Sequence, residues 1–202
     1  MGLTKAHAEP AEPPGPPAAG PTQERIAALG STDSQVRRQA VLDLRNQRSA
    51  IAALLAAYPG EPDPATREAL FTVLAEFDDL DVGRAFVADL ALEDAVTRNA
   101  AATALNSMPG AVALLIDDLL QAPSVRARTM AVTVLTGLNH PGVAGWLAGV
   151  IRQESDENVV AAALDAALQA GGDAPELIGT ALARFPANPY LSFLAHTYAS
   201  SP

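Results

Sequence analysis

The chain has 202 residues, of which 49% are hydrophobic, 18% charged and only 4% aromatic, and its formal net charge is −10. This length suits one domain or a short array of repeats, and it excludes a large multidomain enzyme. The acidic balance argues against nucleic acid as the main partner, because phosphate binding needs a surplus of cations. The absence of cysteine excludes disulfides, thiolate metal sites and thiol nucleophiles.

The first 21 residues differ in composition from the rest of the chain. They hold six prolines, and no large apolar residue follows Leu3. Such a segment cannot bury enough apolar surface to offset its ordering entropy, so we expect residues 1–21 to be a disordered Pro/Ala-rich tail. Two PxxP spacings within it suit an aromatic groove on another protein, and a plain linker is the simpler interpretation. With neither a secretory signal nor an apolar stretch of membrane-spanning length, we expect a cytoplasmic protein without membrane insertion.

From residue 22 onward the sequence is helical and repeats with a period near 30. In four copies an arginine precedes apolar residues at three, four and seven positions further on, and the fifth copy has Val160 in its place. Successive copies are offset by 30, 31, 30 and 32 residues. Four residues before the arginine position stands an Asp or Ser, the residue types that cap helix N-termini. These caps and arginines are Asp33, Arg37, Asp63, Arg67, Asp94, Arg98, Ser124, Arg128 and Asp156. Each copy therefore opens with a capped amphipathic helix.

The second half of each copy predicts another helix, reached through a short turn with helix-breaking residues such as Pro109-Gly110. These second helices are expected over 49–58, 82–91, 111–121, 143–152 and 176–185. No window alternates with period two, so no strand is expected. The repeat domain spans 22–202, with repeats at about 33–60, 63–91, 94–121, 124–152 and 156–185. A helix over 22–29 and another over 188–199 are expected to cap the two ends.

The pattern D-x-x-[VT]-R-x-x-A-[AV]-x-x-L at this period resembles HEAT repeats, and the short period is similar to that of phycobilisome-lyase-type HEAT proteins. A single hairpin cannot bury its apolar face alone and stacks on the next copy. The resemblance implies an all-α fold, a right-handed α-solenoid of about five helical hairpins with terminal capping helices. Two copies depart from the pattern, since the fourth has Ser124 as its cap and the fifth lacks the arginine.

Chemistry-bearing motifs are missing from the sequence. There is no metalloprotease motif, nucleophile elbow, phosphate loop or dinucleotide fingerprint. Lys5 is the only lysine, so the folded region offers no Schiff-base lysine. The three histidines lack metal-site spacing, and acidic pairs such as Asp78-Asp79 are interpreted as solvated helix ends and turns. We therefore expect no catalytic residue, no metal and no cofactor.

The function that fits best is a non-catalytic scaffold, adaptor or assembly factor that binds a partner protein on the concave face formed by the second helices. Residues 22–202 carry 12 arginines and 21 acids, a net charge of −9, which favours a partner with a basic or neutral contact surface. The candidate partner-binding residues are Arg84, Asp89, Asp117, Trp146 and Arg152. For Trp146 a core position is the first interpretation and a partner anchor the alternative, because the residues that we align with it, Leu54, Leu115 and Ala181, are apolar.

Two further features each allow two interpretations. The Asp and Arg columns are expected to form a structural ladder in which each arginine reaches the capping acid of its own or a neighbouring repeat, while a site for an acidic ligand is the alternative. Four of the nine aromatic residues fall in the last eighteen positions, where they cap the stack or promote self-association. The family resemblance implies an alternative function, a lyase-like or chaperone-like factor in tetrapyrrole attachment to a partner protein.

Overall fold

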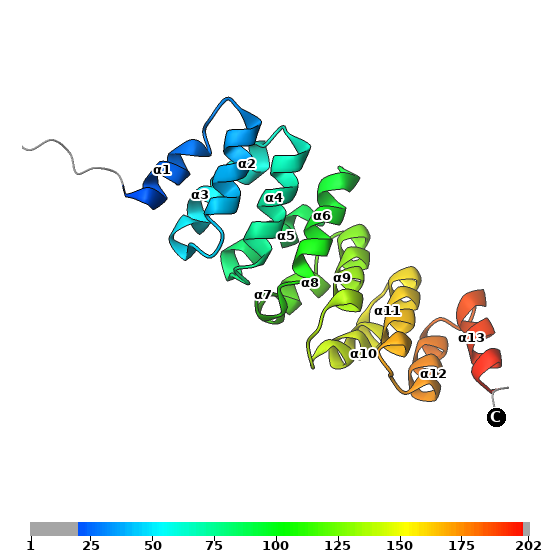
Figure 1. Cartoon of the computed structure of the whole chain (residues 1–202). Coiled ribbons are helices and arrows are strands. Elements are labelled where there is room, and N and C mark those ends of the chain that lie inside the picture. Colours follow the sequence, from blue (N-terminus) through cyan, green and yellow to red (C-terminus); the bar gives the residue numbers. More distant parts are fainter. Residues whose placement is uncertain (1–19, 200–202) are drawn as a thin grey trace, which may run out of the picture.

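The computed structural model describes residues 20–199, which contain thirteen α-helices and two short 3₁₀ helices joined by turns and loops (Figure 1). No strand occurs in that part. The elements are α1 (Pro21–Ala28), α2 (Ser34–Asp43), η1 (Arg48–Ala50), α3 (Ile51–Ala57), η2 (Tyr58–Gly60), α4 (Pro64–Ala75), α5 (Leu80–Asp89), α6 (Ala95–Leu105), α7 (Pro109–Leu114), α8 (Ile116–Leu120), α9 (Val125–Gly137), α10 (Val143–Gln153), α11 (Glu157–Gln169), α12 (Ala174–Arg184) and α13 (Pro189–Ala199).

The helices form an all-α solenoid with two rows (Figure 1). The first helices of the repeats, α2, α4, α6, α9 and α11, pack side by side in one row. The second helices form the other row, namely α3, α5, α7 with α8, α10 and α12. Helices α1 and α13 lie at the two ends. The apolar stripes of both rows meet in one continuous core, whose fully buried members include Leu54, Leu70, Leu105, Leu135 and Leu147. None of the described helices is long and apolar enough to cross a membrane.

Each first helix begins at the residue that the sequence pattern assigns as its cap. The Asp33 and Asp63 carboxylates accept hydrogen bonds of 2.8 Å from backbone N–H groups of their own first turns. Ser124 does the same at 3.1 Å, and Asp94 and Asp156 each accept two such bonds. These bonds satisfy N–H groups that have no partner within the helix, and they fix where each first helix starts.

The second helices differ from the sequence-based expectation in two repeats. In the third repeat the single helix expected over 111–121 is wrong, because the chain breaks at Leu115 (φ −106°, ψ 11°) into α7 and α8. Asp117 and Asp118 lie in the first turn of α8, where the free N–H groups of a new helix favour carboxylates. In the first repeat the second helix is shortened to α3, with a 3₁₀ turn on each side.

The boundary between the tail and the repeat domain also differs from the sequence-based expectation. Residues 1–19 of the predicted tail lie outside the described residues. Pro21, which we assigned to the tail, is the first residue of α1. Proline suits this position because the first helical N–H has no partner in any case.

Candidate partner-binding site

The repeat arginines bind backbone carbonyls. Each of the four donates to the carbonyl groups five and six residues before it, in the loop that leads into its own helix. The bonds to the carbonyl six residues before are 2.9 Å for Arg37, 2.9 Å for Arg67, 2.8 Å for Arg98 and 3.0 Å for Arg128. A charged donor thus holds the loop between successive repeats in one conformation.

The fifth repeat obtains this bond from a different element. Val160 occupies the arginine position, so no guanidinium is available from α11. Arg184 at the end of α12 donates instead to the Ile151 carbonyl at 2.7 Å and to the Glu154 carbonyl at 2.5 Å. Glu154 lies six residues before Val160, so the same carbonyl position is satisfied from the second row of helices.

At two junctions the arginine also bridges to the next repeat through a glutamate. Arg37 makes two hydrogen bonds to Glu61, at 2.8 and 2.6 Å, and Arg128 makes two to Glu154, at 2.6 and 3.1 Å. The glutamate side chains are only 4% and 7% exposed. We call each of these contacts an inter-repeat ion pair. The hydrogen bond from Arg37 lowers the pKa of Glu61 below its ordinary value.

The expected ladder of capping aspartates and arginines is therefore wrong in its partners. The ion pairs found among the described residues join the ladder arginines to Glu61 and Glu154 and not to the caps. The ladder arginines turn back instead onto the loop carbonyls that precede their helices. The caps still act on the arginines at longer range, since Asp33 and Asp63 help to raise the pKa of Arg37 after the larger effect of its Glu61 hydrogen bond.

The two junctions on either side of the third repeat lack a buried arginine–glutamate pair of this kind. The positions that correspond to Glu61 and Glu154 are Leu92 in the third repeat and Ala122 in the fourth. Arg98, which would face a glutamate at position 122, keeps a buried Nε with no hydrogen-bond partner. Helix α6 also packs less extensively on α4 and α9 than α2 packs on α4 or α11 on α9. The first-helix row is therefore most open around α6.

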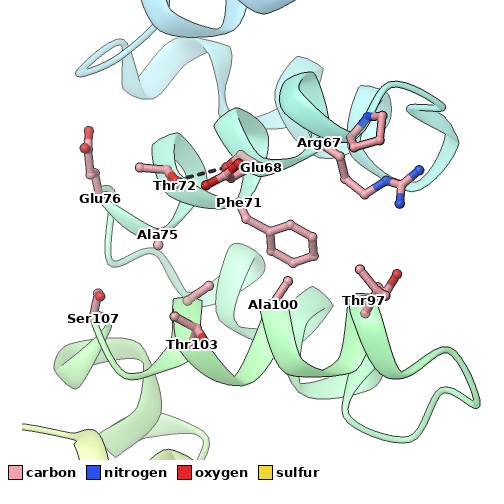
Figure 2. Close-up of a pocket in the computed structure, with 13 residues that line it drawn as sticks. Arg67, Glu68, Phe71, Thr72, Ala75, Glu76, Thr97, Ala100, Thr103 and Ser107 are labelled. Atoms are coloured by element: carbon pink, nitrogen blue, oxygen red, sulfur yellow. Dashed lines mark hydrogen bonds between the residues drawn. The ribbon is translucent and has the colours of Figure 1, made fainter.

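An open groove of about 650 Å³ lies at this place, between α4 and α6 (Figure 2). Phe71 projects from α4 toward α6, and Ala75, Ala100 and Ala104 complete a mostly apolar floor. The rims are polar, with acids on the α4 side and hydroxyl groups on both sides. The rim residues are Arg67, Glu68, Thr72, Glu76, Thr97, Thr103 and Ser107.

The side chains of α6 that face the groove are small. Ala100 corresponds to Met130 in the next repeat, and Ala104 corresponds to Val134. Alanine at both positions leaves space across from Phe71, whose ring is held by edge-on packing at 5.2 Å against Tyr58. The floor is therefore formed by a packed aromatic ring on the α4 side and by short side chains on the α6 side. Sequence reasoning missed this groove, and the two alanines do not mark it alone, because Ala162 and Ala166 stand at the same positions of α11.

The five residues proposed for partner binding from the sequence lie on the second-helix row, and the structure does not gather them. No hydrogen bond, ion pair or ring contact joins any two of them within residues 20–199. Arg84, Asp117 and Arg152 are exposed, and Arg84 pairs with an acid on its own helix. Asp89 is half-buried at the end of α5, with one carboxylate oxygen lacking a partner, and burial raises its pKa to about 6.

Trp146 is less buried than the residues with which we aligned it. Leu54 is 0% exposed, Leu115 is 2% exposed and the neighbouring Leu147 is 0% exposed, whereas Trp146 is half-buried. The indole stacks on the His140 ring with centroids 4.7 Å apart. Trp146 is thus neither a core residue nor a fully exposed anchor.

The C-terminal aromatics divide between packing and exposure. The Tyr190 hydroxyl donates to Asp165 on α11, which raises the pKa of Tyr190 to about 12. Leu191, also on α13, is fully buried. Phe193 is 64% exposed and Tyr198 is 43% exposed, so α13 covers the end of the stack and also presents an apolar surface of its own.

The acidic residues of the turn before α5 cap helix N-termini. Asp78 accepts hydrogen bonds from the Gly110 and Ala111 N–H groups, at 2.9 and 2.8 Å, and so caps α7 of the next repeat. Asp79 caps α5 and pairs with Arg48 at 2.9 Å. Within the described part of the chain no three His, Asp or Glu side chains gather as a metal site.

Comparison with known proteins adds little to this geometry. No family model matches the chain, and no curated protein matches it in sequence. Among solved structures it is similar to the complex of CpcE and CpcF of phycocyanin lyase from Nostoc sp. PCC7120. The TM-score is 0.38 and the identity 18%, over 95% of this chain and 99% of that chain. This likeness is too weak to carry an argument, and the assignment as an all-α solenoid follows from the helices themselves.

Proposed function

We propose that this protein is a non-catalytic interaction scaffold that binds a segment of a partner protein in the groove between α4 and α6. The observation that carries the proposal is the groove itself, an open apolar space of about 650 Å³ with a polar rim. Solenoids build their binding surfaces from such rows of stacked helices. An apolar floor surrounded by polar groups is typical of sites where a partner side chain is desolvated.

The experiment is affinity capture from native lysate with two matched variants. Ala100→Met fills the groove with the residue that the chain uses at the corresponding position of the fourth repeat, and methionine is a good helix former. Ala162→Met makes the same change at the corresponding position of α11. A protein that wild type and Ala162→Met recover, and that Ala100→Met loses, supports the proposal. Recovery that is equal for all three chains refutes it.

The second-helix row remains a prediction, and the same experiment tests it. Trp146→Ala removes its largest partly exposed side chain. If capture depends on Trp146 and is indifferent to Ala100→Met, recognition belongs to the second helices and the groove proposal fails. Circular dichroism melts of each variant show whether a loss of capture reflects a loss of folding.

A further inference from the structure

The groove follows the direction of its two helices. Its α4 wall runs from Pro64 to Glu76, and its α6 wall runs from Val96 to Ser107. At 1.5 Å per residue, twelve residue steps along α4 give a length of about 18 Å, or roughly three helical turns. A slot of this length between two parallel helices matches the shape of a third helix that lays its apolar stripe inward.

The charge of the rim selects the kind of helix. Glu68 and Glu76 stand on the α4 rim and are both exposed, eight residues apart, which is about 12 Å along the helix. Arg67 is the single cation of the lining, and its guanidinium is already hydrogen-bonded to the Glu61 carbonyl at 3.1 and 2.9 Å. The opposite rim presents uncharged hydroxyl groups and the apolar side chain of Val96, which is 68% exposed. The groove lining thus contains two carboxylates, of which Glu68 is free of an ion pair within the described residues, and little positive charge.

One of the two carboxylates has a competitor within the chain. Glu76 pairs with Arg45 of the preceding repeat at 2.8 Å, with the side chains 39% and 44% exposed, and it points away from α6 (Figure 2), so it has to turn toward the groove to meet a partner. An ion pair this exposed contributes little to stability, so a cation from a partner can replace Arg45 at small cost. The net charge of −9 over residues 22–202 attracts a basic segment from a distance as well.

From these features we infer that the groove binds an amphipathic helix of a partner protein, with small or medium apolar side chains on its inward stripe and two Lys or Arg residues seven or eight positions apart. This inference rests on the proposed function and adds the chemistry of the bound segment. The apolar stripe covers Phe71 and the two α6 alanines, and the two cations reach Glu68 and Glu76. Specificity for basic helices comes from the rim, whereas most of the affinity comes from the floor.

The test selects peptides without presupposing their sequence. A randomised library of 16-residue peptides is displayed on phage, panned on the full chain and counter-selected on Ala100→Met. We expect the enriched peptides to have apolar residues with helical spacing and a Lys or Arg pair seven or eight positions apart. Enriched peptides that are acidic or lack helical periodicity overturn the inference, as does the failure to enrich any peptide on wild type over Ala100→Met.

Fluorescence anisotropy with the best enriched peptide then measures the two contributions separately. We expect Kd to rise about tenfold or more for Ala100→Met and about fivefold or more for Glu68→Gln/Glu76→Gln, with no change for Ala162→Met. Glu24→Gln/Glu176→Gln removes the same number of exposed charges from α1 and α12, outside the groove, and is the control for general electrostatic attraction. If this control weakens binding as much as the rim variant, the assigned role of the rim is wrong.

The two proposals fail in different ways. If lysate capture depends on Ala100 but the selected peptides are acidic or extended, the groove is a binding site and only the inference about basic helices fails. If capture does not depend on Ala100, the proposed function fails whatever the library returns.

Discussion

Removing the glutamate of an inter-repeat ion pair tests the role that we assign to these contacts. Glu154→Ala gives the junction between the fourth and fifth repeats the residue that the chain has at the corresponding position 122. Three N–H groups lose their acceptor, namely Nε and Nη2 of Arg128 and the backbone N–H of Asp156. Breaking a buried ion pair from one side costs roughly 3–5 kcal/mol. Because the Arg128 side chain is 16% exposed and keeps its bond to the position-122 carbonyl, we expect a smaller loss of about 2–3 kcal/mol.

The assay is equilibrium unfolding in urea followed by circular dichroism, with Glu93→Ala as the matched control. Glu93 pairs with Arg126 at 2.6 Å, as short as the Glu154 contact, but its side chain is 89% exposed against 7% for Glu154. We expect no resolved change for this control, because exposed ion pairs contribute little. A loss for Glu154→Ala no larger than for Glu93→Ala would refute the argument that burial gives the pair its strength.

The pH dependence of the same variant supplies a sign test. Burial alone raises the pKa of Glu154, but the hydrogen bonds from Arg128 and from the Asp156 N–H outweigh it, so the pKa lies below its ordinary value of 4.5. A lowered pKa in the folded state stabilises the fold above the unfolded value and loses that effect as pH falls through the folded value. The stability difference between wild type and Glu154→Ala should therefore be full at pH 7 and shrink below about pH 4.5. A difference that grows in acid contradicts the assignment.

Three other changes follow from single contacts. Ala122→Glu should give the buried Arg98 Nε its missing acceptor and raise stability by about 1 kcal/mol, and an unchanged urea midpoint would mean that the two side chains do not meet. Asp89→Asn should stabilise the fold at pH 7 by roughly 1 kcal/mol and have no effect at pH 4. The reason is that a pKa raised from 3.8 to about 6 lowers stability as pH rises through that range, so a gain at both pH values would contradict the assignment. Asp78→Gly keeps the left-handed backbone (φ 44°) but removes the cap of α7. We expect thermal melts to show a loss of about 1 kcal/mol of stability. A gain in stability would show that backbone strain at Asp78 outweighs the cap.

Much of the fold could be predicted from the sequence because its determinants are local. A cap such as Asp63 acts within its own first turn, and the apolar spacing that follows fixes the buried face of one helix. The break at Leu115 was missed because the stretch from Ala111 to Ile116 has no glycine, proline or polar residue. Nothing in that stretch predicts where the helix ends, although the carboxylate pair that follows suits the start of a new helix.

The partners of the arginines and the groove were not predictable in the same way. Glu61 lies 24 residues from Arg37, and a glutamate occurs at this position in only two of the copies, so no periodic signal marks it. The groove depends on how far apart two neighbouring helices lie, which a single-helix pattern does not describe. Ala100 and Ala104 resemble ordinary core alanines, and comparison between repeats does not single them out, because the fifth repeat has Ala162 and Ala166 at the same positions.

The most direct test of the central proposal is site-specific photo-crosslinking from the intact protein in native lysate. A benzophenone side chain replaces Thr103 on the exposed rim of the groove, and in a second chain it replaces Asp118 on the exposed surface of α8. We predict a crosslinked partner from position 103 that position 118 does not give, and that disappears when Ala100→Met is added. A partner crosslinked from position 118 alone would contradict the account and place binding on the second-helix row.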